Sequence, residues 1–84
     1  MQVNWENKII LVVDDTKMNF VVLKTQLRKT NANVLWMENG HDAVQYIKNG
    51  NKADLILMDI RMPVMDGIEA SRIIKEFNPN IPIV

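Results

Sequence analysis

The chain has 84 residues, ten basic and ten acidic side chains, no cysteine, and 48% hydrophobic residues, which allows one small domain. Zero formal charge argues against a nucleic-acid-binding surface, because affinity for a phosphate backbone needs a basic excess or a basic stripe. The lack of cysteine excludes a disulfide scaffold, and no apolar run approaches the roughly 18 residues of a membrane span, so we expect a cytoplasmic location without a membrane segment.

Three strand–helix pairs are predicted in chain order, followed by the start of a fourth strand. Apolar runs predict strands at 8–13, 34–37 and 54–59, and a strand start at 81–84. The first helix is predicted from Thr16 to about Lys29, the second between Gly40 and Asn49, and the third from Asp66 to Asn78. Strands that alternate with helices imply right-handed crossovers and therefore a parallel sheet, which makes the chain an α/β protein.

Each helix carries a predicted apolar stripe that faces the sheet. The first helix is interpreted as amphipathic, and Trp36 in the second strand is interpreted as a core residue. Asp66 is predicted to cap the third helix, with Glu69 three residues later completing a variant of the capping box. The three stripes are Phe20, Leu23 and Leu27; Ala43, Val44 and Ile47; and Ala70, Ile73, Ile74 and Phe77.

Acidic residues follow two of the predicted strands. Asp14 and Asp15 come directly after the first strand, and Asp59 ends the third. If these strands are neighbours, the three carboxylates meet at the carboxyl edge of the sheet, where open α/β sheets bind ligands. Oxygen ligands of this kind suit Mg²⁺, and a carboxylate held beside Mg²⁺ can attack phosphorus and form an aspartyl phosphate.

The acidic motifs resemble those of response regulator receiver domains of two-component signalling, the CheY-like family. The resemblance rests on Val12-Val13-Asp14-Asp15, on Leu57-Met58-Asp59-Ile60-Arg61-Met62-Pro63-Val64-Met65-Asp66-Gly67, and on Ile81-Pro82-Ile83-Val84. It implies a doubly wound, flavodoxin-like parallel sheet with strand order 2-1-3-4-5, present here as three βα units plus the start of strand 4.

The resemblance also implies roles for individual residues. Asp59 is the expected phosphoacceptor, which takes a phosphoryl group from a sensor histidine kinase or a phosphotransfer protein. Mg²⁺ is the expected cofactor: Asp15 and Asp59 bind it directly, Asp14 binds it through water or as a further ligand, and the backbone carbonyl of Arg61 completes the protein ligands. The residues expected to shape the loop after the phosphoacceptor are Met62, Pro63, Asp66 and Gly67.

The family's receivers are longer than this chain. A Ser or Thr after strand 4 and a Lys after strand 5 belong to the family pattern and are absent here. We therefore expect residues 1–7 to be a lead-in or linker segment and 8–84 to be a partial receiver domain, which can form a homodimer through the surface left uncovered. The amino-acid sequence of the motifs is similar to that of receivers in hybrid sensor histidine kinases.

Two other functions remain open from the sequence. The chain can be an interaction or dimerisation module that is no longer phosphorylated. It can also be a Mg²⁺-dependent aspartyl phosphotransferase or phosphatase of the haloacid-dehalogenase-like class, but that class needs Asp-x-Asp-x-Thr where this chain has Asp14-Asp15-Thr16. We expect a phosphoacceptor rather than an enzyme, with His41 on the surface, Asp42 as an acid in the first turn of its helix, and Asp54 at the opposite edge of the sheet.

Overall fold

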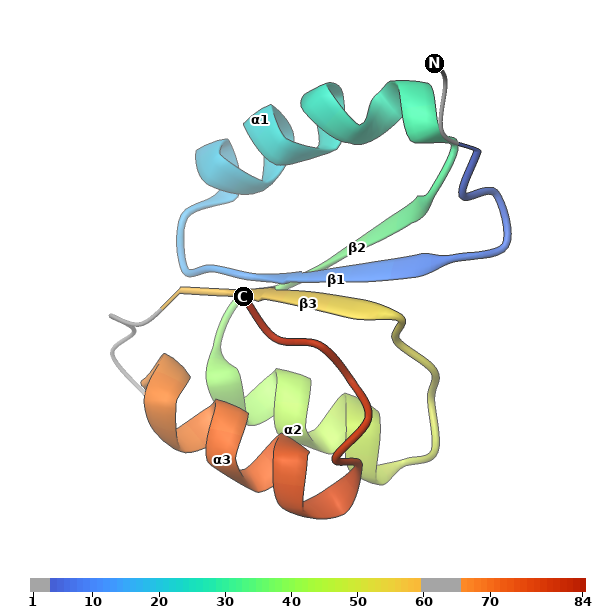
Figure 1. Cartoon of the computed structure of the whole chain (residues 1–84). Helices are drawn as coiled ribbons and strands as arrows, with labels where there is room; N and C mark the ends of the chain where they lie inside the picture. The colour runs from blue at the N-terminus through green and yellow to red at the C-terminus, as the bar shows by residue number, and fades with distance from the viewer. Residues whose placement is uncertain (1–3, 60–65) are drawn as a thin grey trace.

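A parallel sheet with helices on both faces forms the structure, a computed structural model that describes residues 4–59 and 66–84 (Figure 1). The strands are β1 (Ile9–Val13), β2 (Asn33–Met37) and β3 (Leu55–Met58), in the order β2-β1-β3. The helices are α1 (Lys17–Leu27), continued by the 3₁₀ turn η1 (Arg28–Thr30), then α2 (Gly40–Lys48) and α3 (Gly67–Phe77). None of the helices in the described ranges is long and apolar enough to cross a membrane.

The strand order confirms the predicted doubly wound sheet. The chain leaves β1, adds β2 on one side, and then crosses to place β3 on the other side. The final segment extends the sheet beyond β3: Ile83 forms a parallel bridge with Ile56, and the Val84 N–H donates to the Ile56 carbonyl oxygen at 2.9 Å. Residues 81–84 therefore begin a fourth strand, as the sequence predicted.

The main core lies between the sheet and the pair α2 and α3, on the lower face in Figure 1. Leu11 and Ile56 are fully buried there, and the predicted stripes of α2 and α3 supply the opposing side chains. Phe77 departs from the prediction, because it is 56% exposed. It is the last residue of α3, and helical periodicity does not reveal where along the axis the neighbouring elements stop covering a stripe. The buried helix residues of this core are Ala43, Val44, Ile47, Ala70 and Ile74.

Of the described helices, α1 is the one that covers the other face of the sheet (Figure 1). The predicted stripe of Phe20, Leu23 and Leu27 is only half-buried, and none of the residues in Lys17–Leu27 is fully buried. The exposed side of α1 mixes apolar residues, with Met18 68% and Val22 47% exposed, with polar ones such as Lys24, so the helix is less clearly amphipathic than predicted.

Trp36 is also not a core residue, contrary to the sequence interpretation. It is half-buried and lies on β2, which is the edge strand of the described sheet. Its ring stacks on Phe20 of α1, with 5.7 Å between the ring centroids and 14° between the planes. An apolar run alone could not distinguish an edge strand from a central one, so the sequence overestimated the burial of this residue.

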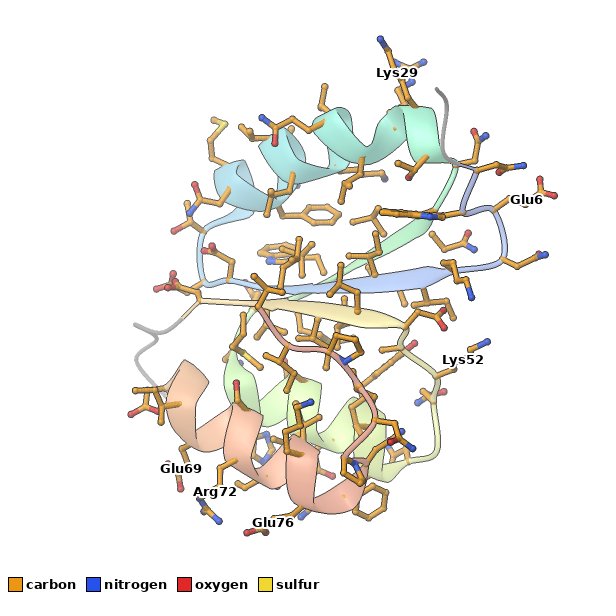
Figure 2. The ribbon with its side chains drawn as sticks, viewed as in Figure 1. Glu6, Lys29, Lys52, Glu69, Arg72 and Glu76 are labelled. Atoms are coloured by element: carbon orange, nitrogen blue, oxygen red, sulfur yellow. The ribbon has the colours of Figure 1, made fainter. Side chains whose placement is uncertain are left out.

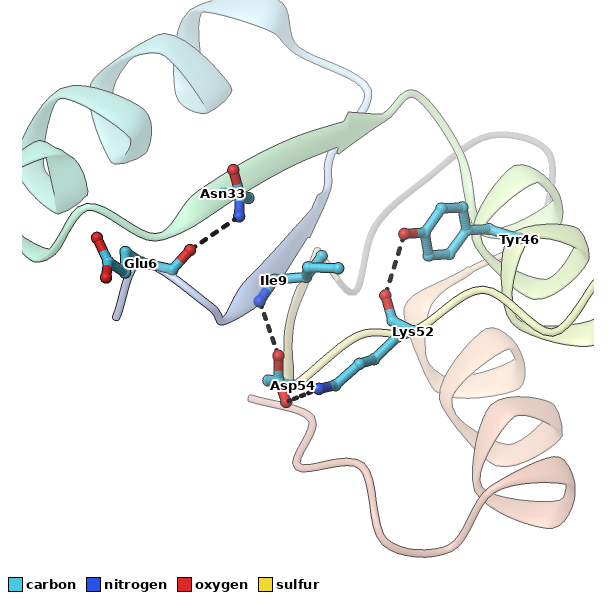
Figure 3. A network of polar contacts seen from close by, with 6 residues as sticks. All are labelled: Glu6, Ile9, Asn33, Tyr46, Lys52 and Asp54. Atoms are coloured by element: carbon cyan, nitrogen blue, oxygen red, sulfur yellow. Dashed lines mark hydrogen bonds and ion pairs between the residues drawn. The ribbon is translucent and has the colours of Figure 1, made fainter. Parts of the chain in front are cut away.

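Polar contacts fix the amino ends of the strands. Asp54 Oδ2 accepts a hydrogen bond from the Ile9 N–H at 2.8 Å, and Lys52 Nζ lies 3.8 Å from Asp54 Oδ1 (Figure 3). On the other side of β1, Asn33 Nδ2 donates to the Glu6 carbonyl oxygen at 3.2 Å (Figure 3). These contacts hold β1 in register with both neighbours from the edge opposite the acidic cluster.

The helices that cover the main core begin with side-chain caps. Asn39 Oδ1 accepts from the Asp42 N–H before α2, and Asp66 Oδ1 accepts from the Glu69 N–H before α3, both at 2.8 Å. The predicted cap at Asp66 is therefore confirmed, but Glu69 forms no reciprocal bond with the Asp66 N–H among the described residues. Gly50 follows α2 with φ 87°, the left-handed conformation expected after a helix end.

Candidate functional site

The carboxyl ends of β1 and β3 bring the predicted acids together. Backbone bonding continues one residue past each strand, because the Asp59 N–H donates to the Val13 carbonyl at 2.9 Å and the Asp14 N–H donates to the Met37 carbonyl at 3.0 Å. Ligand oxygens of Asp14, Asp15 and Asp59 all lie within 4.8 Å of one another. The topology thus assembles the three carboxylates at the edge where open α/β sheets bind ligands.

The charge on this cluster favours a cation. Two carboxylates about 4 Å apart repel each other by roughly 1–4 kcal/mol at effective dielectric constants of 80 to 20. No lysine or arginine in the described parts of the chain forms an ion pair with Asp14 or Asp15. Asp14 and Asp59 are half-buried and Asp15 is exposed, so a small ion can reach the oxygens from solvent. This all-oxygen donor set fits Mg²⁺.

Asp14 is held by two neighbours that sequence reasoning missed. Its Oδ1 accepts from the Thr16 N–H at 2.8 Å, while Asn19 Nδ2 lies 3.3 Å from Oδ1 and 3.1 Å from Oδ2. Asp15 has a weaker contact, a 3.3 Å hydrogen bond from the Thr16 hydroxyl. Asn19 stands in the first turn of α1, and helical side chains lean toward the helix N-terminus, so its position could have indicated this contact.

Trp36 fixes the backbone of the same aspartate. Its indole Nε1–H donates to the Asp14 carbonyl oxygen at 2.8 Å. Trp36 pairs with Val12 across the sheet, and side chains alternate between faces along a strand, so Trp36, Val12 and Asp14 share the face of α1. This alternation was the signal in the sequence, but it requires the register between β1 and β2, which the sequence did not supply.

A depression of about 180 Å³ lies beside the acids. Asp14 and Asp59 form its polar side, and Val12, Leu23 and Leu57 are among its apolar lining residues. The carboxylates therefore border a space between α1 and the sheet that a small group can enter.

The remaining predicted residues lie partly outside the described parts of the chain and partly away from the acidic cluster. Arg61, Met62 and Pro63 lie outside the described residues. Asp66 caps α3 and Gly67 is buried at the start of that helix, which places both at the end of the segment that follows Asp59. His41 is exposed and its Nδ1 lies 3.8 Å from Asp42 Oδ1, so its predicted surface position is confirmed, and Asp42 lies in the first turn of α2, as predicted.

Comparison with known proteins identifies the family. The profile of the response regulator receiver domain matches residues 10–84. The chain belongs to the response regulator receiver domain family. It is 42% identical over 84 residues to the autoinducer 1 sensor kinase/phosphatase LuxN of Vibrio campbellii, covering all of this chain and 10% of that protein. It is 50% identical over 68 residues to probable histidine kinase 4 of Oryza sativa subsp. japonica, covering 81% of this chain and 7% of that protein.

Solved receiver structures have the same fold. The response regulator protein TrrA from Thermotoga maritima, in complex with Mg²⁺–BeF, is 34% identical with a TM-score of 0.83 and covers 90% of this chain and 65% of that one. The receiver domain of a histidine kinase from Arabidopsis thaliana, complexed with Mg²⁺ and BeF₃⁻, is 31% identical with a TM-score of 0.75 and covers 92% and 63%. The flavodoxin-like fold predicted from the motifs is confirmed.

Family membership bears on the classes that the sequence left open, and it does not separate a phosphoacceptor from a receiver that serves only as an interaction module. Receiver domains are the phosphoacceptor modules of two-component phosphorelays, and the assembled carboxylates are consistent with that role. The haloacid-dehalogenase-like alternative finds no support in the family match. The chain spans about a tenth or less of the two kinases it matches, so the activity of the whole protein is a separate question.

Proposed function

We propose that this domain accepts a phosphoryl group on the Asp59 carboxylate and acts as a phosphoacceptor rather than as an enzyme. The observation that carries the proposal is the convergence of Asp14, Asp15 and Asp59 within 4.8 Å at the carboxyl edge of a receiver-family sheet. Asp59 directly follows β3, just as Asp14 and Asp15 directly follow β1. Its carboxylate borders the depression, which gives a phosphoryl donor an approach from solvent.

The proposed transfer moves one phosphoryl group between two side chains. A carboxylate oxygen of Asp59 forms a bond to phosphorus, while the bond between phosphorus and a histidine nitrogen of the donor breaks and the nitrogen keeps the electron pair. The expected donors are a sensor histidine kinase or a phosphotransfer protein. Apolar walls at Leu23 and Leu57 limit water on one side of the acids, which favours survival of the acyl phosphate.

We propose Mg²⁺ as the cofactor of this transfer. Asp14, Asp15, Asp59 and the backbone carbonyl of Arg61 would hold the ion, directly or through water. When bound, Mg²⁺ neutralises charge on the phosphoryl oxygens and on the carboxylates. Two related structures are complexes with Mg²⁺ and a beryllium fluoride, and the donor set here fits the same hard ion.

A mass-spectrometric labelling experiment tests the assignment. The protein is incubated with phosphoramidate and Mg²⁺, and the phosphorylated residue is located after trapping the acyl phosphate. Asp59→Asn should abolish labelling, whereas the matched control Asp42→Asn, an exposed acid at the start of α2, should leave it intact. Labelling that persists in Asp59→Asn, or an unlabelled wild-type protein, would contradict the proposal.

We further propose that the parent protein is a hybrid sensor histidine kinase. The relatives LuxN and the rice kinase support this, since each is a kinase much longer than the matched segment. The transcriptional regulatory protein ZraR of Salmonella typhimurium, 43% identical over 75 residues, shows that receivers of similar sequence also occur in regulators. The cytoplasmic location, the boundary between 1–7 and 8–84, the shaping of the loop and a homodimer stay predictions.

A further inference from the structure

Asp14 is held far more tightly than Asp15, the exposed acid of the cluster. Four of its atoms have hydrogen-bond partners: the backbone N–H, the backbone carbonyl, and both carboxylate oxygens. Among the described residues, the Asp15 carboxylate has one hydrogen-bond partner, the hydroxyl of Thr16 at 3.3 Å. Before a cation binds, the Asp14 carboxylate is therefore already oriented by the protein, whereas the Asp15 carboxylate is largely solvated.

Asn19 is the side chain that orients the Asp14 carboxylate. A carboxylate can only accept hydrogen bonds, so the amide nitrogen of Asn19 is the atom that faces it. This nitrogen contacts both oxygens, at 3.3 and 3.1 Å, and so restrains rotation of the carboxylate plane. The Trp36 indole holds the carbonyl of the same residue at 2.8 Å, which fixes the backbone from which the side chain extends.

The neutrality of the amide matters for the chemistry. A lysine at this position would form an ion pair with Asp14 and compete with a divalent cation, whereas an amide orients the carboxylate and leaves its negative charge in place. A carboxylate offers about four acceptor positions, and the Thr16 N–H and the Asn19 amide do not exhaust them. Asp14 can therefore keep its contacts while it accepts a cation or a cation-bound water.

We propose that Asn19 is a positioning residue that pre-orients Asp14 for the divalent cation, an inference that rests on the proposed function. Preorganisation removes part of the conformational entropy lost when the ligand is ordered. Outer-shell partners of this kind typically change metal affinity by about 10–100-fold when they are removed. Asn19 touches no other acid of the cluster among its hydrogen bonds to described residues, so its effect should act through Asp14 alone.

The test uses Mn²⁺ alone as the probe, with free ion counted by electron paramagnetic resonance and Mg²⁺ added as competitor. Asn19→Ala removes the side chain, and Asn19→Leu keeps a similar volume without the donor. Both should weaken Mn²⁺ binding by about tenfold or more. Gln26→Ala, which removes an exposed amide from the same helix, should leave the affinity unchanged. Far-UV circular dichroism confirms that the variants are folded.

The outcomes separate this inference from the proposed function. If wild type binds Mn²⁺ and Asn19→Leu binds equally well, Asn19 only fills space and the inference is wrong. If Asn19→Ala binds more tightly, the amide competes with the ion and the inference is also wrong. If wild type binds no Mn²⁺, the proposed metal site and the proposed role of Asn19 are both wrong.

A second measurement needs no variant. In ¹⁵N-labelled wild-type protein, addition of Mg²⁺ should shift the side-chain amide resonances of Asn19, because the charge on the carboxylate that they contact changes. The side-chain amide of Gln26 should not shift. A helix-stabilising role for Asn19 would leave both pairs of resonances in place and would overturn the inference.

Discussion

The two faces of the sheet are built differently. Strand residues are fully buried on both faces, Ile10 and Val12 under α1 included, but of the described helices only α2 and α3 bury residues of their own, and both begin with a side-chain cap. On the face of α1, the helix has no buried residue, its N-cap residue Thr16 forms no capping bond, and its first turn contains no acid. Asp14 and Asp59 line the depression on this second face, together with Leu23. The contrast indicates that one face supplies most of the stability and the other supplies the site.

This separation has a physical consequence for the site. A carboxylate cluster without a cation is under mutual repulsion. The helix beside it, α1, has no fully buried residue and is packed less tightly than α2 and α3. The tightly packed face meanwhile keeps the ends of β1 and β3 in register. The site thus combines fixed backbone positions with a neighbouring helix that is weakly restrained.

The largest expected effect compares two adjacent residues that face opposite ways on β3. Ile56 is 0% exposed in the main core, and Leu57 is half-buried beside α1. Ile56→Ala should lower the free energy of unfolding by about 2–5 kcal/mol, since it leaves a cavity that well-packed neighbours cannot fill. Leu57→Ala should cost about 1–2 kcal/mol, because its site is already partly open. Urea denaturation measures both.

Equal losses of unfolding free energy in the two variants would contradict the difference between the faces, because they would show that the α1 face is as tightly packed as the other. The slope of free energy against urea should stay the same in both variants, which would show that the denatured state is unchanged. A stability of about 4–13 kcal/mol is typical for a domain of this length. Ile56→Ala therefore removes a large part of the total, and the measurement needs low temperature or a stabilising salt.

Removing a helix cap should also lower the free energy of unfolding, but by less than Ile56→Ala. Asn39→Ala and Asp66→Ala each remove a side-chain acceptor from a helix amide and should cost about 1 kcal/mol. Thr16→Ala should cost less than about 0.5 kcal/mol, because its side chain caps no amide of α1. Thermal unfolding of the three variants checks this order. Asn39→Asp, which retains a capping oxygen, is the control that should stay near wild type.

If Thr16→Ala matched the two cap variants, α1 would contribute more to stability than its exposure suggests. The difference between the faces would then lie in packing alone and not in the helix ends. A lower stability in Asn39→Asp would instead indicate that the amide nitrogen of Asn39, which contacts Asp42 Oδ2, contributes to stability as well as the capping oxygen.

Much of the fold could be predicted from local patterns. Unbroken apolar runs marked the three strands, and the spacing of Ala70 and Ile74 marked the buried side of α3. Asp14, Asp15 and Asp59 could be predicted to meet because carboxyl ends of parallel strands share one edge. The prediction that β1 and β3 are adjacent strands, however, came from the resemblance to receiver domains and not from these patterns.

The remaining features depend on where elements end and on which strand lies at an edge. Phe77 continued the periodic stripe but lies at the exposed end of its helix, and Trp36 belonged to an apolar run that forms an edge strand. The contact between Asn19 and Asp14 depends on the turn between β1 and α1. No periodicity encodes that turn, so the place of Asn19 in the first turn of α1 could suggest the contact, but only the structure showed its geometry.

The smallest expected effect concerns the outward side of α3, where Arg72 and Glu76 point away from the sheet (Figure 2). Arg72 Nη1 lies 2.9 Å from Glu76 Oε1, one helical turn apart, but both side chains are more than half exposed. Arg72→Ala should therefore change the free energy of unfolding by only about 0.3–0.5 kcal/mol at low salt. Because salt screens exposed pairs, this difference should disappear in urea titrations at about 1 M NaCl. A loss that persisted in salt would mean that the stem of Arg72 packs on α3, and that the stability of this face does not come from its buried stripe alone.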